Sequence, residues 1–144
     1  MTARLAATPM HDTAPLQTLA EHAAQQAYAP YSRLRVGAAL RSCSSHIYTG
    51  CNVENASYTL GCCAERAAIA TAVQAEGTHF RLAAIAVAAF SSTGERLPIT
   101  PCGGCRQALV EFGEEAVVGF LLPDGHWQEV RASDLLPYRF AFPK

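Results

Sequence analysis

Cys63-Ala-Glu65 and, further along the chain, Pro101-Cys-Gly-Gly-Cys105 are the stretches that decide how this sequence is interpreted. Three thiols and one carboxylate in this order indicate an open zinc site, because a structural zinc ion normally has four protein ligands whereas a catalytic one keeps three and leaves a position for water. We therefore predict that Cys63, Cys102 and Cys105 bind zinc. Glu65, two residues from a ligand, is the predicted proton carrier.

Each cysteine motif is followed by a stretch that favours a helix. Residues 64–75 are rich in Ala, Glu and Gln, and residues 103–112 end before a glycine. Both helices would begin at the cysteines, so their free N–H groups and dipoles would face the thiolates. Three thiolates on Zn²⁺ leave a net charge of about −1, which opposes ionisation of a bound water. Arg66 and Arg106 are therefore predicted to lie beside the thiolates as further positive charge.

The cysteines also allow other interpretations. An isolated Cys-x-x-Cys is more often a redox pair or half of a structural zinc knuckle, and the added Cys-x-Glu favours a catalytic site. Cys62 competes with Cys63 as a ligand, but on a helix the two point about 100° apart, so only one can serve. The spacing to Glu65 favours Cys63. A disulfide framework is not expected in a chain of 144 residues that is 50% hydrophobic and shows no secretory signal, so the six cysteines indicate a reducing, cytoplasmic location.

Length and charge limit the possible functions. One domain is expected over residues 13–144, preceded by a loose tail at residues 1–12. The chain has 11 basic and 12 acidic residues, so it lacks the basic footprint of a nucleic-acid-binding protein. It also lacks an uncharged apolar run of about 18 residues, so no membrane span is expected. The predicted substrate is a small molecule.

The remaining pattern predicts the order αββαβαββ. A helix beginning near Thr13 has an apolar repeat that continues to Tyr28, and Pro30 ends it. The strands are expected at residues 36–40, 46–52, 82–90, 117–122 and 127–130. This alternation predicts an α/β fold with a mixed sheet, with the site at helix N-termini along one edge.

Six sequence blocks together resemble the short, homotetrameric cytidine deaminases. The zinc motifs also fit the general signature of nucleobase deaminases, in which the glutamate is not a ligand. The blocks cover most of the chain: Tyr28-Ala-Pro-Tyr-Ser32, Val36-Gly-Ala-Ala39, Gly50-Cys-Asn-Val-Glu-Asn-Ala-Ser-Tyr58, Cys63-Ala-Glu-Arg66, Pro101-Cys-Gly-Gly-Cys-Arg-Gln107 and Leu135-Leu-Pro137. The resemblance implies a three-layer fold with a central mixed sheet of about five strands and helices on both faces.

The resemblance also implies a reaction: hydrolytic deamination of cytidine and deoxycytidine to uridine and deoxyuridine, with release of ammonia, through a zinc-bound hydroxide and the Glu65 proton shuttle. It implies that the backbone N–H of Ala64 meets the pyrimidine O2 and that Asn52 and Glu54 hold the ribose hydroxyls. Judged without the surrounding block, Asn52 is more often a turn residue and Glu54 a solvated charge. An amide and a carboxylate do suit a neutral nucleoside better than Arg or Lys clusters.

The resemblance implies a pocket shared between subunits, and this sequence departs from the family pattern at one place. In that family the pocket is completed across subunits, so Ala56 and Tyr58 are expected to line a neighbour's site and Phe140 to close it. The family pattern places Phe-Pro where this chain has Leu34 and Arg35. Leu34 covers an apolar ring face without an aromatic surface, and Arg35 is expected to add a charge near the mouth.

Three alternatives to cytidine deamination remain. The first is a deaminase of another aminopyrimidine compound, such as a blasticidin-type nucleoside antibiotic, which Asn52 and Glu54 disfavour. The second is a noncatalytic zinc-stabilised oligomer, which Glu65 beside an open ligand position disfavours. The third is a nucleic-acid editor, which would need a positive surface. The preference between ribose and deoxyribose stays open.

Overall fold

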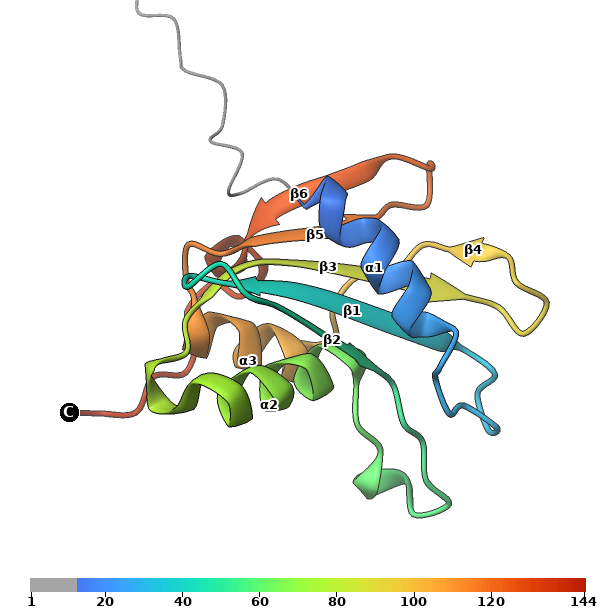
Figure 1. Cartoon of the computed structure of the whole chain (residues 1–144), viewed down its shortest axis with the longest axis horizontal. Coiled ribbons are helices and arrows are strands. Elements are labelled where there is room, and N and C mark those ends of the chain that lie inside the picture. Colours follow the sequence, from blue (N-terminus) through green and yellow to red (C-terminus); the bar gives the residue numbers. More distant parts are fainter. Residues whose placement is uncertain (1–12) are drawn as a thin grey trace, which may run out of the picture.

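Six strands form one mixed sheet in the computed structural model, which describes residues 13–144 (Figure 1). The loose tail predicted for residues 1–12 lies outside the described part. The helices are α1 (Ala14–Ala24), α2 (Ala64–Glu76) and α3 (Gly103–Phe112), with short 3-10 turns at Tyr58–Leu60, Gly77–His79 and Ala132–Leu135. The strands are β1 (Arg35–Ser42), β2 (Ile47–Cys51), β3 (Leu82–Phe90), β4 (Arg96–Leu97), β5 (Val117–Leu121) and β6 (Trp127–Arg131).

The strands lie in the order β2-β1-β3-β5-β6, and β4 pairs with β3. Only β3 and β5 run parallel among these pairs, and the chain passes through α3 to connect them. The predicted mixed sheet is confirmed. The two-residue β4 falls in the segment between the predicted strand at 82–90 and the second cysteine motif, where no strand was expected.

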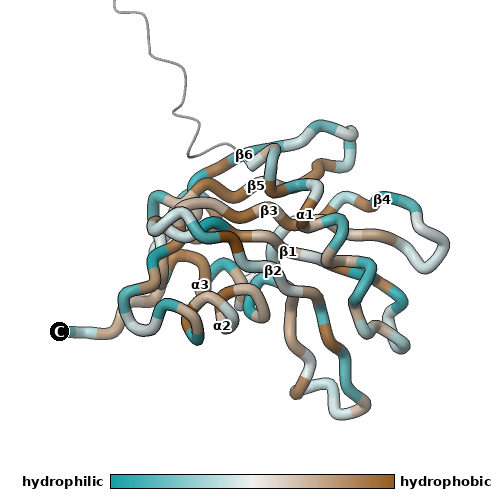
Figure 2. The backbone as a smooth tube through the Cα atoms, viewed as in Figure 1, coloured by the Kyte–Doolittle hydropathy of each residue, from teal (hydrophilic) through white to brown (hydrophobic). Residues whose placement is uncertain are grey.

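Helices cover both faces of the sheet, which confirms the three-layer α/β fold (Figure 1). α1 packs its buried Leu16, Ala20 and Ala24 against β1 and β3 on one face, and α2 and α3 pack on the other. All nine residues of β3 are buried, and hydrophobic residues follow β3 and β5 between the layers (Figure 2). No helix within residues 13–144 has the length and hydropathy needed to cross a bilayer.

α1 ends at Ala24, about one turn earlier than its apolar repeat predicts. The backbone of Tyr28 instead pairs with the segment after β2: Tyr28 N donates to Asn52 O at 3.1 Å, and Glu54 N donates to Tyr28 O at 2.8 Å. Because a helical Tyr28 could not make this pairing, a long-range contact ends the helix before the local pattern does.

Two glycines let helices approach the sheet closely. A Cβ atom at Gly37 would lie 2.0 Å from Ala20 O in α1. A Cβ at Gly50 would lie 2.5 Å from Ala68 N and 2.7 Å from Ala64 O in α2. Neither distance is possible for a real side chain, so glycine in β2 allows the first turns of α2 to lie directly on the sheet. This contact fixes where Cys63, immediately before α2, is placed.

Candidate active site and metal centre

The three predicted zinc ligands come together at two helix N-termini. Cys63 is the N-cap residue of α2, Cys102 is the N-cap residue of α3, and Cys105 lies in the first turn of α3. Their Sγ atoms all lie within 4.8 Å of one another, and those of Cys63 and Cys102 are 3.9 Å apart. The fold therefore assembles thiols that are 39 residues apart in sequence.

This cluster fits zinc in both geometry and chemistry. Tetrahedral sulfur ligands at about 2.3 Å from the metal would be roughly 3.8 Å from each other. No fourth His, Cys, Asp or Glu joins the cluster in the described chain. Burial raises the pKa of the Cys105 thiol and of the Cys63 thiol, so a nearby cation would be needed to hold these two thiols ionised. The donor set is that of an open zinc site.

Cys62 stays outside the sulfur cluster, although it precedes Cys63 directly. Its Sγ donates a hydrogen bond to the Cys63 carbonyl oxygen at 3.5 Å, and it lines the neighbouring cavity. The Sγ atom that lies beside those of Cys102 and Cys105 is that of Cys63 and not that of Cys62.

Glu65 lies in the first turn of α2 and is only 4% exposed. Burial raises the pKa of its carboxyl group, and this effect exceeds the opposing hydrogen bond from Cys105 and the charge of Arg66. The carboxyl group lines the same cavity as Cys63 and Cys102. A buried carboxyl group beside an open metal position is placed to exchange protons.

The two arginines predicted beside the thiolates have different surroundings. Arg66 Nη2 lies 3.9 Å from Cys63 Sγ and also reaches Gly61 O at 3.4 Å. Arg106 donates instead to main-chain carbonyls, from Nε to Pro101 O at 2.8 Å and from Nη1 to Leu135 O at 3.1 Å. Arg106 thus ties the start of α3 to the C-terminal region.

A cavity of about 650 Å³ opens over Cys63, Cys102 and Glu65. Leu34, Val36 and Ile99 give it apolar walls, and Asn52 and Glu54 bring polar groups to it. Ala64 also lines it, at the helix start where backbone N–H groups have no intrahelical acceptor. Within residues 13–144, no Lys or Arg lines this cavity.

Asn52 and Glu54 have a role in the structure that the sequence did not indicate: both hold the segment at residues 31–36. Asn52 Oδ1 accepts from Val36 N and its Nδ2 donates to Leu34 O, each at 2.8 Å. Glu54 Oε1 accepts from the backbone N–H groups of Tyr31 and Ser32, each at 3.0 Å. Hydrogen bonds from the Ser32 side chain and from these amides lower the pKa of Glu54, so the carboxylate is held ionised.

The residues expected at a neighbour's site lie at the surface. Tyr58 is 79% exposed and packs edge-on against Tyr31 with ring centroids 5.9 Å apart, at the rim of this chain's own cavity. Ala56 is exposed and Phe140 is 65% exposed, and neither lines this chain's own cavity. Phe140 is held through its carbonyl oxygen, which accepts from Gln107 Nε2 at 3.0 Å.

Sequence reasoning missed several residues of the cavity. Ile99 and Thr100 line it from the segment before α3, and their sequence carries no motif that could have identified them. Tyr31 and Ser32 also line the cavity; they belong to the sequence block at residues 28–32, for which no role was predicted. Arg35, whose charge was expected near the mouth, does not line this cavity.

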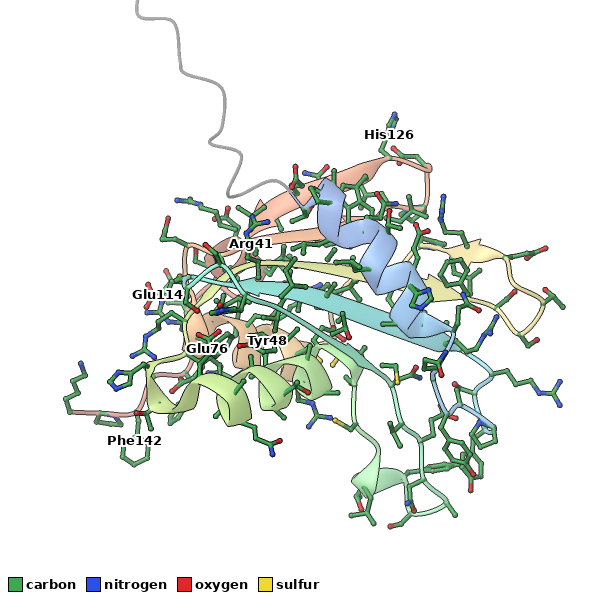
Figure 3. All side chains as sticks on the ribbon, in the orientation of Figure 1. Arg41, Tyr48, Glu76, Glu114, His126 and Phe142 are labelled. Carbon is green, nitrogen blue, oxygen red and sulfur yellow. The ribbon has the colours of Figure 1, made fainter. Side chains whose placement is uncertain are left out.

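A polar cluster at the other end of α2 is separate from the site. Figure 3 shows Tyr48 beside Glu76 at the C-terminal end of α2. Tyr48 OH donates to Glu76 Oε2 at 2.8 Å, and Ser44 Oγ donates to Glu76 Oε1 at 2.8 Å. This cluster fixes β2 to the end of α2.

Comparison with known proteins gives consistent matches across most of the chain. A family model described as "Cytidine and deoxycytidylate deaminase zinc-binding region" matches residues 10–121. A cytidine deaminase of Sporosarcina psychrophila is 40% identical over 120 residues, covering 83% of this chain and 84% of the relative. A cytidine deaminase of Mycobacterium tuberculosis is 42% identical over 121 residues, covering 84% of each.

Solved structures agree with the sequence relatives. The crystal structure of cytidine deaminase from Burkholderia pseudomallei has a TM-score of 0.76 and 42% identity, and the match covers 88% of this chain and 97% of that one. The structure of the Mycobacterium tuberculosis enzyme has a TM-score of 0.72 and 41% identity, with coverage of 91% and 98%. Fold and sequence therefore point to the same group of proteins.

Proposed function

This chain belongs to the cytidine deaminase family, and from that membership and its cavity we propose that it hydrolyses cytidine and deoxycytidine to uridine and deoxyuridine with release of ammonia. The observation that carries the proposal is the buried Glu65 carboxyl group facing a cavity that also contains two zinc-ligand thiols. A purely structural zinc site would need neither an open side nor a buried acid.

The reaction needs one nucleophile and two proton transfers. Bound by Cys63, Cys102 and Cys105, zinc would supply the Lewis acidity that makes water nucleophilic at neutral pH. Glu65 accepts a proton from the attacking water and delivers it to the ring N3, then carries the second proton to the departing amino nitrogen. The products are the 4-keto pyrimidine and ammonia, so both protons of the water are accounted for.

Substrate binding is assigned to groups around the cavity. The free N–H of Ala64 at the start of α2 would donate to the pyrimidine O2, and the α2 dipole favours that oxygen. Asn52 and Glu54 would contact ribose hydroxyls with the bonding capacity that residues 31–36 leave unused: one Nδ2 hydrogen of Asn52 and the remaining lone pairs of the Glu54 carboxylate. The absence of Lys and Arg from the described lining favours a neutral nucleoside over a nucleotide.

We propose a homotetramer with shared sites. The exposed Tyr58 and Phe140 support it, since large aromatic side chains at the surface are commonly buried by partners. Phe140→Ala should then raise KM for cytidine more than it lowers Tm. A fully active monomer by light scattering under assay conditions would contradict the shared site.

The six unpaired cysteines support a reducing, cytoplasmic location.

An ultraviolet assay with four substrates tests the function. Zinc-loaded protein should convert cytidine and deoxycytidine, with much lower catalytic efficiency on free cytosine and on CMP. Cytosine lacks the hydroxyls that Asn52 and Glu54 would bind, and CMP brings a phosphate toward a lining whose described residues include no Lys or Arg. Equal efficiency for cytosine and cytidine would contradict the ribose contacts, and no turnover of either nucleoside would contradict the proposal as a whole.

A further inference from the structure

Residue 35 is where two sets of contacts hold the same backbone. On the cavity side, Asn52 bonds Leu34 O and Val36 N, the groups immediately before and after Arg35. On the other side, the Arg35 side chain reaches away from the cavity, as alternation along a strand requires when residues 34 and 36 both line it. Leu34 and Val36 therefore depend on a backbone that is fixed from both faces of the sheet.

The Arg35 guanidinium joins two elements on the α1 side. Its Nη1 donates to Gln25 Oε1 at 3.0 Å, just after the last residue of α1, and its Nη2 donates to Ser91 O at 3.2 Å, just after β3. A cation at the C-terminal end of α1 also interacts favourably with the helix dipole. One side chain thus connects the start of β1 to the ends of α1 and β3.

These contacts do not satisfy the guanidinium. Arg35 Nε is buried and has no hydrogen-bond partner among residues 13–144. A buried donor without an acceptor is unfavourable, so an arginine here is a poor choice if stability alone decides the residue. The position is better explained by what the side chain does for residues 34 and 36.

We propose that Arg35 is a positioning residue for the substrate: it anchors, from the α1 side of the sheet, the backbone that presents Leu34 to the pyrimidine. This inference rests on the proposed function and extends it to a residue outside the cavity. Arg35 touches no reacting atom, so it acts on substrate binding through Leu34 and not on proton transfer by Glu65.

Arg35→Met tests this, because methionine keeps the length and apolar volume of the side chain while removing its donors. We expect KM for cytidine to rise severalfold with kcat unchanged, since ring packing acts on the ground and transition states alike. Tm should not fall, because the unsatisfied donor is removed as well. The matched control is Arg33→Met, two residues away, whose exposed side chain makes no hydrogen bond or ion pair within residues 13–144 and whose loss should leave KM unchanged.

A double-mutant cycle separates positioning from general destabilisation. If Arg35 acts through Leu34, Arg35→Met in a Leu34→Ala background should raise KM by less than it does alone, because contacting residues that share one function are not additive. Multiplicative effects of the two substitutions on KM would overturn the proposal, and so would equal KM values for Arg35→Met and Arg33→Met.

If Arg35→Met does not fold, a second variant tests the same contact. Gln25→Ala removes one acceptor of the Arg35 guanidinium at an exposed position and should also raise KM. An unchanged KM in Gln25→Ala overturns the role of Arg35. A wild-type chain that does not turn over cytidine overturns the proposed function itself, whereas an active wild type isolates the test of Arg35.

Discussion

Gly50 in β2 lies directly beneath Ala68 in α2, so close that a Cβ atom on the glycine would be 2.5 Å from the backbone nitrogen of the alanine. The second turn of the helix that begins at Cys63 therefore rests on the sheet backbone. This contact connects the sheet to the position of one zinc ligand and of Glu65.

Replacing Gly50 with alanine should displace α2. Overpacking in a core usually costs about 1–3 kcal/mol, and here the obstacle is backbone, which cannot rotate away. We expect a lower Tm and less than one zinc per chain. Gly104→Ala is the control, because a Cβ there meets nothing within 4 Å. Normal zinc content and Tm in Gly50→Ala would show that the helix has room to move.

Metal content should distinguish the adjacent cysteines. Cys63→Ala should lose zinc, because it removes one of three clustered thiolates, whereas Cys62→Ala should keep about one zinc per chain, because Cys62 Sγ bonds a carbonyl outside the cluster. Elemental analysis of the purified variants measures this. The reverse pattern would reassign the ligand.

Glu65→Gln should separate binding from chemistry. The amide keeps the size of the side chain but cannot carry a proton, so kcat should fall by about 10²–10⁴ while zinc content and nucleoside binding remain. Turnover and calorimetric titration with cytidine measure the two effects. Glu111→Gln, at an exposed position on α3, is the control and should stay active. Near-normal turnover by Glu65→Gln would exclude the proton-carrier role.

Glu76 should make the stability depend on pH. Burial acts to raise the pKa of its carboxyl group, but hydrogen bonds from Ser42, Ser44 and Tyr48 and the nearby His46 outweigh burial, and the pKa is held below its usual value of 4.5. A lowered folded-state pKa stabilises the fold above about pH 4.5, and this contribution is lost as pH falls through the folded value.

Melting curves of the wild type and Glu76→Gln from pH 7 to pH 3 measure this effect. The Tm difference should be largest near neutral pH and shrink in acid. Both proteins should also carry His46→Asn, so that Glu76 is tested without the imidazole whose Nδ1 lies 3.6 Å from its Oε2. A difference that stays constant with pH would show that the Glu76 charge does not matter.

Thr13 should contribute to stability through its hydroxyl group. Thr13 is fully buried, its Oγ1 donates to Glu129 Oε2 at 2.6 Å, and Trp127 Nε1 donates to Thr13 Oγ1 at 2.9 Å. Thr13→Val keeps the shape but removes both bonds, so the free energy of unfolding should fall by about 1–3 kcal/mol. Thr13→Ser should retain most of the stability. Equal denaturant midpoints for Val and Ser would contradict a role for the hydroxyl.

The sequence alone determined most of the helices and strands and the kind of metal site. β3 and α3 have the predicted bounds because nine consecutive apolar residues and a glycine-ended helical stretch are local signals that do not depend on partners. The cysteine spacing predicted the zinc ligands because three soft donors with a nearby carboxyl group suit few other chemistries, and six sequence blocks indicated the family.

Only the tertiary structure decided what holds the site in place. The end of α1 depends on the pairing of Tyr28 with residues 52–54. The side chains of Asn52 and Arg35 hydrogen-bond main-chain groups that only folding brings beside them. A side chain that bonds main-chain atoms leaves no pattern in the sequence, because every residue type offers nearly the same N–H and C=O groups. The chemistry was therefore readable from residue types and spacing, whereas the anchoring of the pocket required the fold.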